Sequence, residues 1–161
     1  MKYFTLQDWI ESQALDGLPH DFSAVDAYDT YLKSIRESLP LAFRRMLDTI
    51  CIHDAALRTM VVDLDRRRVS IELDAGDVTM REPRHVRLCY EEAERIVSVA
   101  DPDQGLGGRF GYGELGNDEI EVLPDGGYEH RLLFSTGIEL QIRFRDFRLE
   151  MLSDRTSGAD E

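Results

Sequence analysis

Ile138-Glu139-Leu140-Gln141-Ile142-Arg143-Phe144 sets the architecture of this chain, because apolar and polar residues alternate along it without a break. Successive side chains of a β-strand point to opposite faces, so this pattern predicts a strand with one buried face. Further along, the apolar residues move to odd positions, at Phe147, Leu149 and Met151. One extra residue would restore the register, so we expect a β-bulge or bend near Arg145-Asp146.

Hairpin turns separate this strand from others that precede it. Strands are expected at residues 110–115, 119–123 and 128–135. The residues between the expected strands are Gly116-Asn117, Asp125-Gly126-Gly127 and Gly137. Glycine and asparagine tolerate the positive φ that hairpin turns need. The last third of the chain is therefore predicted to be a series of antiparallel strands.

A second group of strands is expected upstream. Residues 58–64 and 68–73 flank the polar turn Asp65-Arg66-Arg67, and a third strand contains Val86, Leu88 and Tyr90. Residues 91–99 fit either a short helix or a strand, and residues 100–108 are expected to form a loop. The short connections favour an antiparallel meander over parallel units with crossover helices.

Helical spacing characterises the first fifty residues. A first helix is expected over residues 6–15 and a second from Ser23 to Leu39. Pro40 ends the second helix and opens a third at its first position. The expected apolar face of the second helix contains Val25, Tyr28, Leu32, Ile35 and Leu39, and that of the third contains Leu41, Met46, Leu47 and Ile50.

Together these patterns predict one α+β domain over residues 1–152. Two or three short N-terminal helices (residues 1–50) pack on a twisted antiparallel β-meander of about six to eight strands (residues 55–152). Residues 153–161 are expected to be a frayed acidic tail.

The charge balance limits the classes of partner. The chain has 161 residues, 19 Lys and Arg against 32 Asp and Glu, and a net charge of −13. Such a chain repels nucleic acid and anionic membranes, because both are bound mainly through basic groups. A basic protein is the favoured partner. The alternative is that the acidity only keeps the protein soluble.

Location and cofactors follow from what the sequence lacks. No secretory signal or membrane-spanning apolar run is visible, so a cytoplasmic location is expected, with Cys51 and Cys89 as buried thiols. The glycine-rich residues 105–111 lack a dinucleotide fingerprint and a Walker lysine. The stretch from Asp101 to Tyr112 lacks the calcium ligands it would need. We therefore expect no cofactor and no metal.

Three residues are candidates for a pocket. His53 and Asp54 are adjacent, as in some metal hydrolases, although Asp54 could instead cap a turn while His53 packs locally. His130 falls on the apolar face of its strand together with Tyr128, Leu132 and Phe134. It is therefore expected to be a hydrogen-bonded core residue, a pH-sensitive point or a catalytic group.

An acidic stretch is the candidate partner-binding surface. On adjacent strands its side chains would converge and attract a basic protein, or they would form an ordinary solvated face. The candidates are Glu114, Asp118, Glu119, Glu121, Asp125 and Glu129.

The C-terminal two thirds resembles a bacterial family of uncharacterised proteins, domain-of-unknown-function family 4085. The resemblance is carried by His53-Asp54-Ala55, Tyr112-Gly113-Glu114, residues 127–133 (Gly-Tyr-Glu-His-Arg-Leu-Leu) and residues 137–146 (Gly-Ile-Glu-Leu-Gln-Ile-Arg-Phe-Arg-Asp), in that order. It implies a bacterial origin and an α+β fold, and it implies no activity.

Two functions are expected from these observations. The first is a non-catalytic protein-binding module, with a role like that of toxin-neutralising immunity proteins by analogy of size and charge alone. The second is a hydrolase or small-ligand-binding protein with a pocket between helices and sheet, in which His53, Asp54 and His130 would meet.

Overall fold

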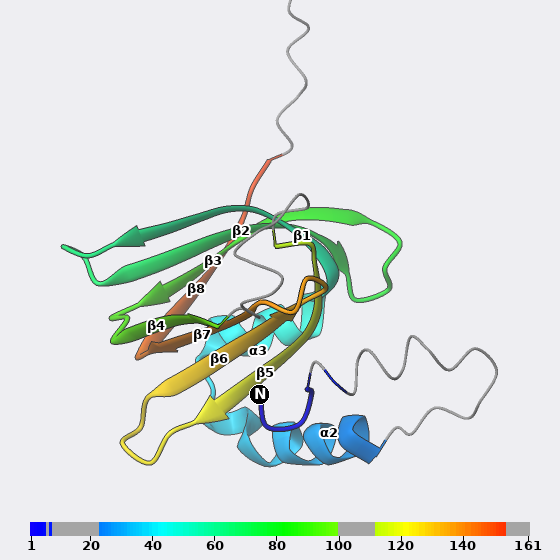
Figure 1. Cartoon of the computed structure of the whole chain (residues 1–161), viewed down its shortest axis with the longest axis horizontal. Helices are drawn as coiled ribbons and strands as arrows, with labels where there is room; N and C mark the ends of the chain where they lie inside the picture. Colours follow the sequence, from blue (N-terminus) through cyan, green and yellow to red (C-terminus); the bar gives the residue numbers. More distant parts are fainter. Residues whose placement is uncertain (6, 8–22, 100–111, 154–161) are drawn as a thin grey trace, which may run out of the picture.

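A computed structural model describes residues 1–5, 7, 23–99 and 112–153. It contains helices on one side of a strongly curved sheet (Figure 1). In chain order the elements are α2 (Ser23–Ile35), the 3-10 helix η1 (Arg36–Ser38), α3 (Leu41–Thr49), β1 (Ile50–Asp63), β2 (Arg68–Asp77), β3 (Pro83–Glu91), β4 (Arg95–Val99), β5 (Glu114–Val122), β6 (Tyr128–Phe134), β7 (Glu139–Phe144) and β8 (Asp146–Met151).

The eight strands form one sheet in the order β4-β7-β6-β5-β1-β2-β3-β8, and every pairing is antiparallel. The predicted α+β class is therefore confirmed. Strands β1, β2 and β3 form one meander, in which each strand pairs with the next along the chain, and β5, β6 and β7 form another. The two halves meet where β1 pairs with β5, through only two residue pairs, Ala55 with Leu115 and Ala56 with Glu114.

The core lies on the inner face of the sheet, as the alternation predicted. Ile138, Leu140, Ile142 and Phe144 are fully buried. Side chains from both halves of the sheet and from α3 complete one hydrophobic cluster, which includes Phe43, Met46, Ile71, Leu73, Val86, Leu88, Tyr90, Leu115, Ile120, Leu132, Phe134 and Phe147. Burial of this many large apolar side chains is the main stabilising contribution to the fold.

The turns after β5 and β6 and the bend after β7 are also confirmed. Gly126 and Gly137 have φ of 80° and 82° in the β5–β6 and β6–β7 turns. At Arg145 the chain leaves β7 and enters β8, which pairs with β3 at the other border of the sheet. The ambiguous segment 91–99 contains strand β4, and residues 100–111 lie outside the described residues.

The hairpin turn predicted at Gly116-Asn117 is wrong. These residues lie inside β5, at a register shift between Leu115 and Asn117 in the pairing with β6. Glycine and asparagine suit a β-bulge as well as a turn, because both tolerate unusual backbone angles. The sheet also begins earlier than expected, since β1 starts at Ile50, directly after α3.

Helix α3 begins one residue later than predicted, and this changes the face that it buries. Pro40 lies just outside the helix, and its carbonyl accepts hydrogen bonds from the N–H groups of Phe43 and Arg44 at 2.9 and 3.0 Å. Phe43 and Met46 therefore face the sheet, whereas Leu41 is 75% exposed. The predicted apolar face was wrong at Leu41 and missed Phe43.

Helix α2 packs beside β5 and completes its hydrogen bonding. Beyond its two pairs with β1, this edge of β5 has no strand partner in the described part of the chain. The hydroxyl oxygens of Tyr28 and Tyr31 accept the N–H groups of Ile120 and Val122 instead, at 2.8 and 3.3 Å. Val25, expected on the buried face of this helix, is exposed. The helix expected over residues 6–15 lies outside the described residues except at Gln7.

Replacement of Phe43 tests how α3 is anchored. Phe43 is fully buried and lies 4.9 Å from Phe147 and 5.1 Å from His130 between ring centroids. We expect Phe43→Ala to lower the free energy of unfolding by about 3–5 kcal/mol, because it leaves a cavity in the core. Denaturant unfolding followed by circular dichroism measures this. Leu41→Ala is the control and should change stability by less than about 0.5 kcal/mol. Equal losses of stability in the two variants would contradict the assignment of Phe43 to the buried face of α3.

Candidate functional site

The structure does not bring the three pocket candidates together. His53 and Asp54 lie in an irregular part of β1, where the register with β2 shifts between Cys51 and Ala56. Their side chains are more than half exposed, 3.4 Å apart, and Asp54 has a φ of 61°. His130 instead points into the core from β6 and has no exposed surface. A pocket shared by these residues is therefore not formed.

His130 is the centre of a buried hydrogen-bonded chain. Its Nδ1 lies 2.8 Å from the Tyr90 hydroxyl, and its Nε2 lies 3.0 Å from an Asp118 carboxylate oxygen. An ionised carboxylate only accepts, so Nε2–H donates to Asp118 and Nδ1 accepts from Tyr90. Burial, followed by the charge of Asp118, raises the pKa of Tyr90, which therefore stays a donor. The three groups therefore satisfy one another's hydrogen-bonding capacity inside the core.

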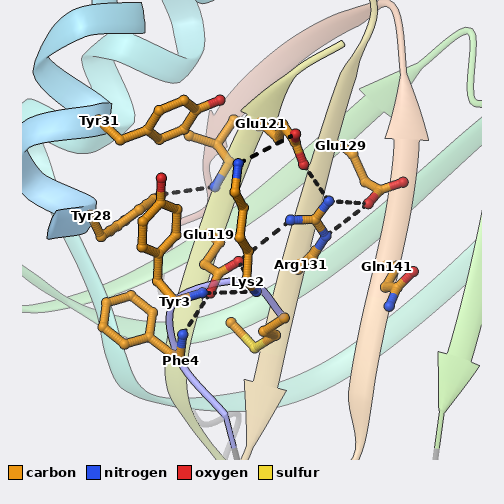
Figure 2. Close-up of polar contacts among 12 residues, drawn as sticks. Lys2, Tyr3, Phe4, Tyr28, Tyr31, Glu119, Glu121, Glu129, Arg131 and Gln141 are labelled. Carbon is orange, nitrogen blue, oxygen red and sulfur yellow. Dashed lines mark hydrogen bonds and ion pairs between the residues drawn. The ribbon is translucent and has the colours of Figure 1, made fainter. Parts of the chain in front are cut away.

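Arg131 gathers half of the predicted acidic residues on the outer face of β5 and β6. Its guanidinium contacts Glu121 directly and lies 2.7 Å from Glu129 and 3.4 Å from Glu119 (Figure 2). Burial acts to lower the pKa of Arg131, but the hydrogen bonds that Arg131 donates to Glu121 and Glu129 outweigh it and raise the pKa. We call these four residues, Glu119, Glu121, Glu129 and Arg131, the Arg131 cluster.

Residues 1–4 lie against the Arg131 cluster. The Glu119 carboxylate accepts hydrogen bonds from the backbone N–H groups of Lys2, Tyr3 and Phe4 at 2.8, 2.6 and 2.7 Å. The Lys2 ammonium lies 4.0 Å from Glu121. Glu119 is only 1% exposed as a result. It was expected to be a surface residue, and this expectation was wrong because residues 1–4 cover it.

Further contacts hold the same segment in place. The amino group of Met1 lies 2.8 Å from a carboxylate oxygen of Glu139. The ring of Tyr3 lies 5.4 and 5.7 Å from those of Tyr28 and Tyr31 on α2. Glu119 thus binds the backbone of residues 2–4, while α2 provides an aromatic surface for their side chains (Figure 2).

The remaining predicted acidic residues have separate environments. Asp118 is part of the His130 chain, and Asp125 contacts Arg143 and Arg145 at the end of the β5–β6 hairpin. Hydrogen bonding from the Gly127 N–H lowers the pKa of Asp125, with the two arginines adding to the effect. Glu114 is exposed, and no ion pair to its carboxylate occurs within the described residues. The six candidates therefore do not form one continuous free patch.

A second polar surface was not anticipated from the sequence. The outer face of β1, β2, β3 and β8 carries a continuous series of contacts between basic and acidic side chains, in which His85 joins two groups of arginine–carboxylate ion pairs. In order they are Arg58, Asp74, His85, Glu72, Arg87, Glu150, Arg148, Glu91 and Arg68. A shallow hollow of about 230 Å³ lies over part of this series, lined also by Thr59, Ser70 and Cys89.

The chemistry of this hollow is limited by its pairing. Its arginines already hold carboxylates. Burial raises the pKa of the Cys89 thiol, which disfavours the nucleophilic thiolate. Cys89 is buried as expected, whereas Cys51 is partly exposed. The series contains four arginines and four carboxylates, so this face is close to electrically balanced.

Metal-binding clusters and membrane-spanning helices are both absent from the described residues. No group of three or more His, Cys, Asp and Glu side chains there is arranged to hold a metal ion. None of the helices in that part of the chain has the length and apolarity to cross a membrane.

Comparisons with known proteins give little further information. No protein-family model matches the chain, and no curated protein matches it. The crystal structure of an uncharacterized protein from Neisseria gonorrhoeae aligns with 64% of this chain and 96% of its own, with 11% sequence identity and a TM-score of 0.44. A similarity at that level bears on neither family nor function.

Removal of the Tyr90 hydroxyl tests the His130 chain. Tyr90→Phe leaves Nδ1 of His130 without its donor in the core, so we expect a loss of about 1–3 kcal/mol in unfolding free energy. Tyr112→Phe is the matched control, because no described residue hydrogen-bonds the Tyr112 hydroxyl. Denaturant titration of both variants measures the difference, and equal stabilities would show that Nδ1 does not depend on Tyr90.

The ion-pair series predicts a pH dependence of stability. The hydrogen bond from Arg87 lowers the pKa of Glu72, so this pair stabilises the fold above the ordinary carboxyl range and the contribution is lost as pH falls below about 4. Arg87→Met should lower stability at pH 7 by on the order of 1 kcal/mol and reduce the loss between pH 5 and 3. Thermal melts across this range test it, with Arg81→Met as control. Parallel pH profiles for Arg87→Met and the unmodified protein would contradict the assignment.

Proposed function

We propose that this protein is a non-catalytic protein-binding module of the bacterial cytoplasm, and that the Arg131 cluster receives a basic segment of its partner. The observation that carries the proposal is that the cluster already holds a cationic segment, residues 1–4, through Glu119 and Glu121. A partner segment with a lysine and free backbone N–H groups offers the same chemistry.

When residues 1–4 leave the Arg131 cluster to make room for the partner segment, the charge of the face that carries the cluster changes. With residues 1–4 in place, Lys2 and Arg131 oppose Glu119, Glu121 and Glu129. Once residues 1–4 leave, Arg131 alone opposes these three carboxylates and Glu139 in addition. The uncovered face is therefore strongly acidic, and it favours a basic replacement at low ionic strength.

The setting and the type of partner rest on charge and resemblance. A net charge of −13 favours encounter with a basic protein, as for an immunity-type protein that neutralises its target. The family resemblance supports a bacterial origin. Separation of His53 and Asp54 from His130 gives no support to the hydrolase alternative, and none of the three residues lines the hollow over the ion-pair series.

A labelled basic peptide tests the proposal. We expect a fluorescein-labelled Met-Lys-Tyr-Phe-Lys-Lys peptide to bind the double variant Lys2→Ala/Tyr3→Ala about tenfold more tightly than the unmodified protein, because residues 1–4 then compete less well. Fluorescence anisotropy measures the affinity, which should fall as NaCl is raised from about 50 to 300 mM.

Substitutions that remove one carboxylate charge at a time locate the binding surface. In the double variant, Glu121→Gln should weaken the peptide about fivefold, since one exposed ion pair is lost. Glu114→Gln lies on the same strand outside the cluster and should have no effect. Equal weakening by both substitutions, or affinity independent of salt, would reject the Arg131 cluster as the binding surface.

A further inference from the structure

The end of the β1–β2 hairpin extends past the neighbouring strands (Figure 1). It carries exposed apolar side chains on both faces: Val61 is 57% exposed, Val62 41% and Leu64 81%. Val61 and Val62 are consecutive strand residues, so they point to opposite faces. The core therefore does not reach this part of the sheet, and the apolar residues stand together instead of being scattered singly.

A groove of about 160 Å³ separates this hairpin end from the segment that leads into β4. Its apolar lining includes Val62, Leu64, Ala93 and Ile96. The two sides are held together by a hydrogen bond from the Ala93 N–H to the Arg67 carbonyl at 2.6 Å. The groove is thus part of a defined structure, not a gap between independent segments.

Two arginines in the groove differ from the other arginines around them. Arg68 pairs with Glu91, and Glu94 is held by Arg143 and Arg145. Asp63 also lines the groove, and its carboxylate lies 3.9 Å from Arg66. Arg67 and Arg95 line the groove too, and neither has a carboxylate within ion-pair distance in the described part of the chain. An acidic protein therefore presents two uncompensated guanidinium groups beside an exposed apolar surface. This combination is complementary to carboxylates spaced along an apolar segment.

The neighbouring backbone favours an extended ligand. Strand β4 is at one border of the sheet and pairs with β7 alone within the described residues. A border strand presents backbone N–H and C=O groups that an added extended segment can pair with. Arg95 and Ile96 belong both to this strand and to the groove.

We propose that the groove binds an extended segment of a partner protein in which acidic and aliphatic residues alternate. Its carboxylates pair with Arg67 and Arg95, and its aliphatic side chains cover Val62, Leu64 and Ile96. This surface is distinct from the Arg131 cluster, because it selects the opposite charge.

The probe for this proposal is a fluorescein-labelled peptide of alternating glutamate and valine, added to the full-length protein. We expect saturable binding by anisotropy, and no binding of the matching lysine–valine peptide to the groove. Arg67→Gln and Arg95→Gln should each weaken the glutamate–valine peptide about fivefold, as expected for the loss of one exposed ion pair. Leu64→Ser should also weaken it, because it removes apolar surface from the groove.

Control variants separate this result from the proposed function. Arg81→Gln removes an exposed arginine outside the groove, and Glu121→Gln alters the Arg131 cluster, so neither should change the affinity for the glutamate–valine peptide. Four outcomes would overturn the proposal: no saturable binding of the glutamate–valine peptide, equal weakening of that peptide by Arg81→Gln, weakening of the lysine–valine peptide by Arg67→Gln and Arg95→Gln to the same extent, or a dimer in sedimentation that Leu64→Ser abolishes, which would make a second copy the occupant. Failure of the basic peptide at the Arg131 cluster would leave this result unaffected.

Discussion

On the edge of β5 that faces away from β6, the N–H groups beyond the two pairs with β1 have no neighbouring strand among the described residues. An unpaired backbone donor in a buried position is costly, so this edge needs a partner of another kind. The hydroxyls of Tyr28 and Tyr31 supply it, and this fixes α2 beside the sheet. The same two rings receive the ring of Tyr3, and Glu119 receives the backbone of residues 2–4. The arrangement around the Arg131 cluster thus follows from how β1 and β5 separate.

Local sequence patterns predicted the strands better than the order of the sheet. Alternation identified β7, and glycine identified the turns at Gly126 and Gly137, because both signals depend only on neighbouring residues. The pairings of β1 with β5, β4 with β7 and β3 with β8 join distant segments, and no local pattern carries that information. Gly116-Asn117 was misassigned as a hairpin turn for a related reason: glycine and asparagine occur both in turns and in β-bulges, and only the strand pairing distinguishes the two.

The candidate site was predicted in part. The acidic residues were recognised, but the basic groups that pair with them were not. Arg131 is visible as a partner in the sequence, since alternation places it on the same face as Glu129. Lys2, by contrast, lies more than a hundred positions from Glu119 and Glu121, and only the folded chain brings them together. His130 was correctly expected to be a hydrogen-bonded core residue, although its partners Tyr90 and Asp118 come from two other strands.

The single-residue link at Arg145 has a consequence for how the chain acquires its structure. It carries the polypeptide from the border of the sheet formed by β4 and β7 to β3, where β8 pairs last in sequence order. Phe147 then fills the space between Phe43 and Tyr90, both of which lie more than 50 residues earlier in the chain. Contacts between such remote segments form late, because closing long loops costs entropy before any contact rewards it. During synthesis on the ribosome, the interior therefore stays incomplete until β8 has emerged from the exit tunnel.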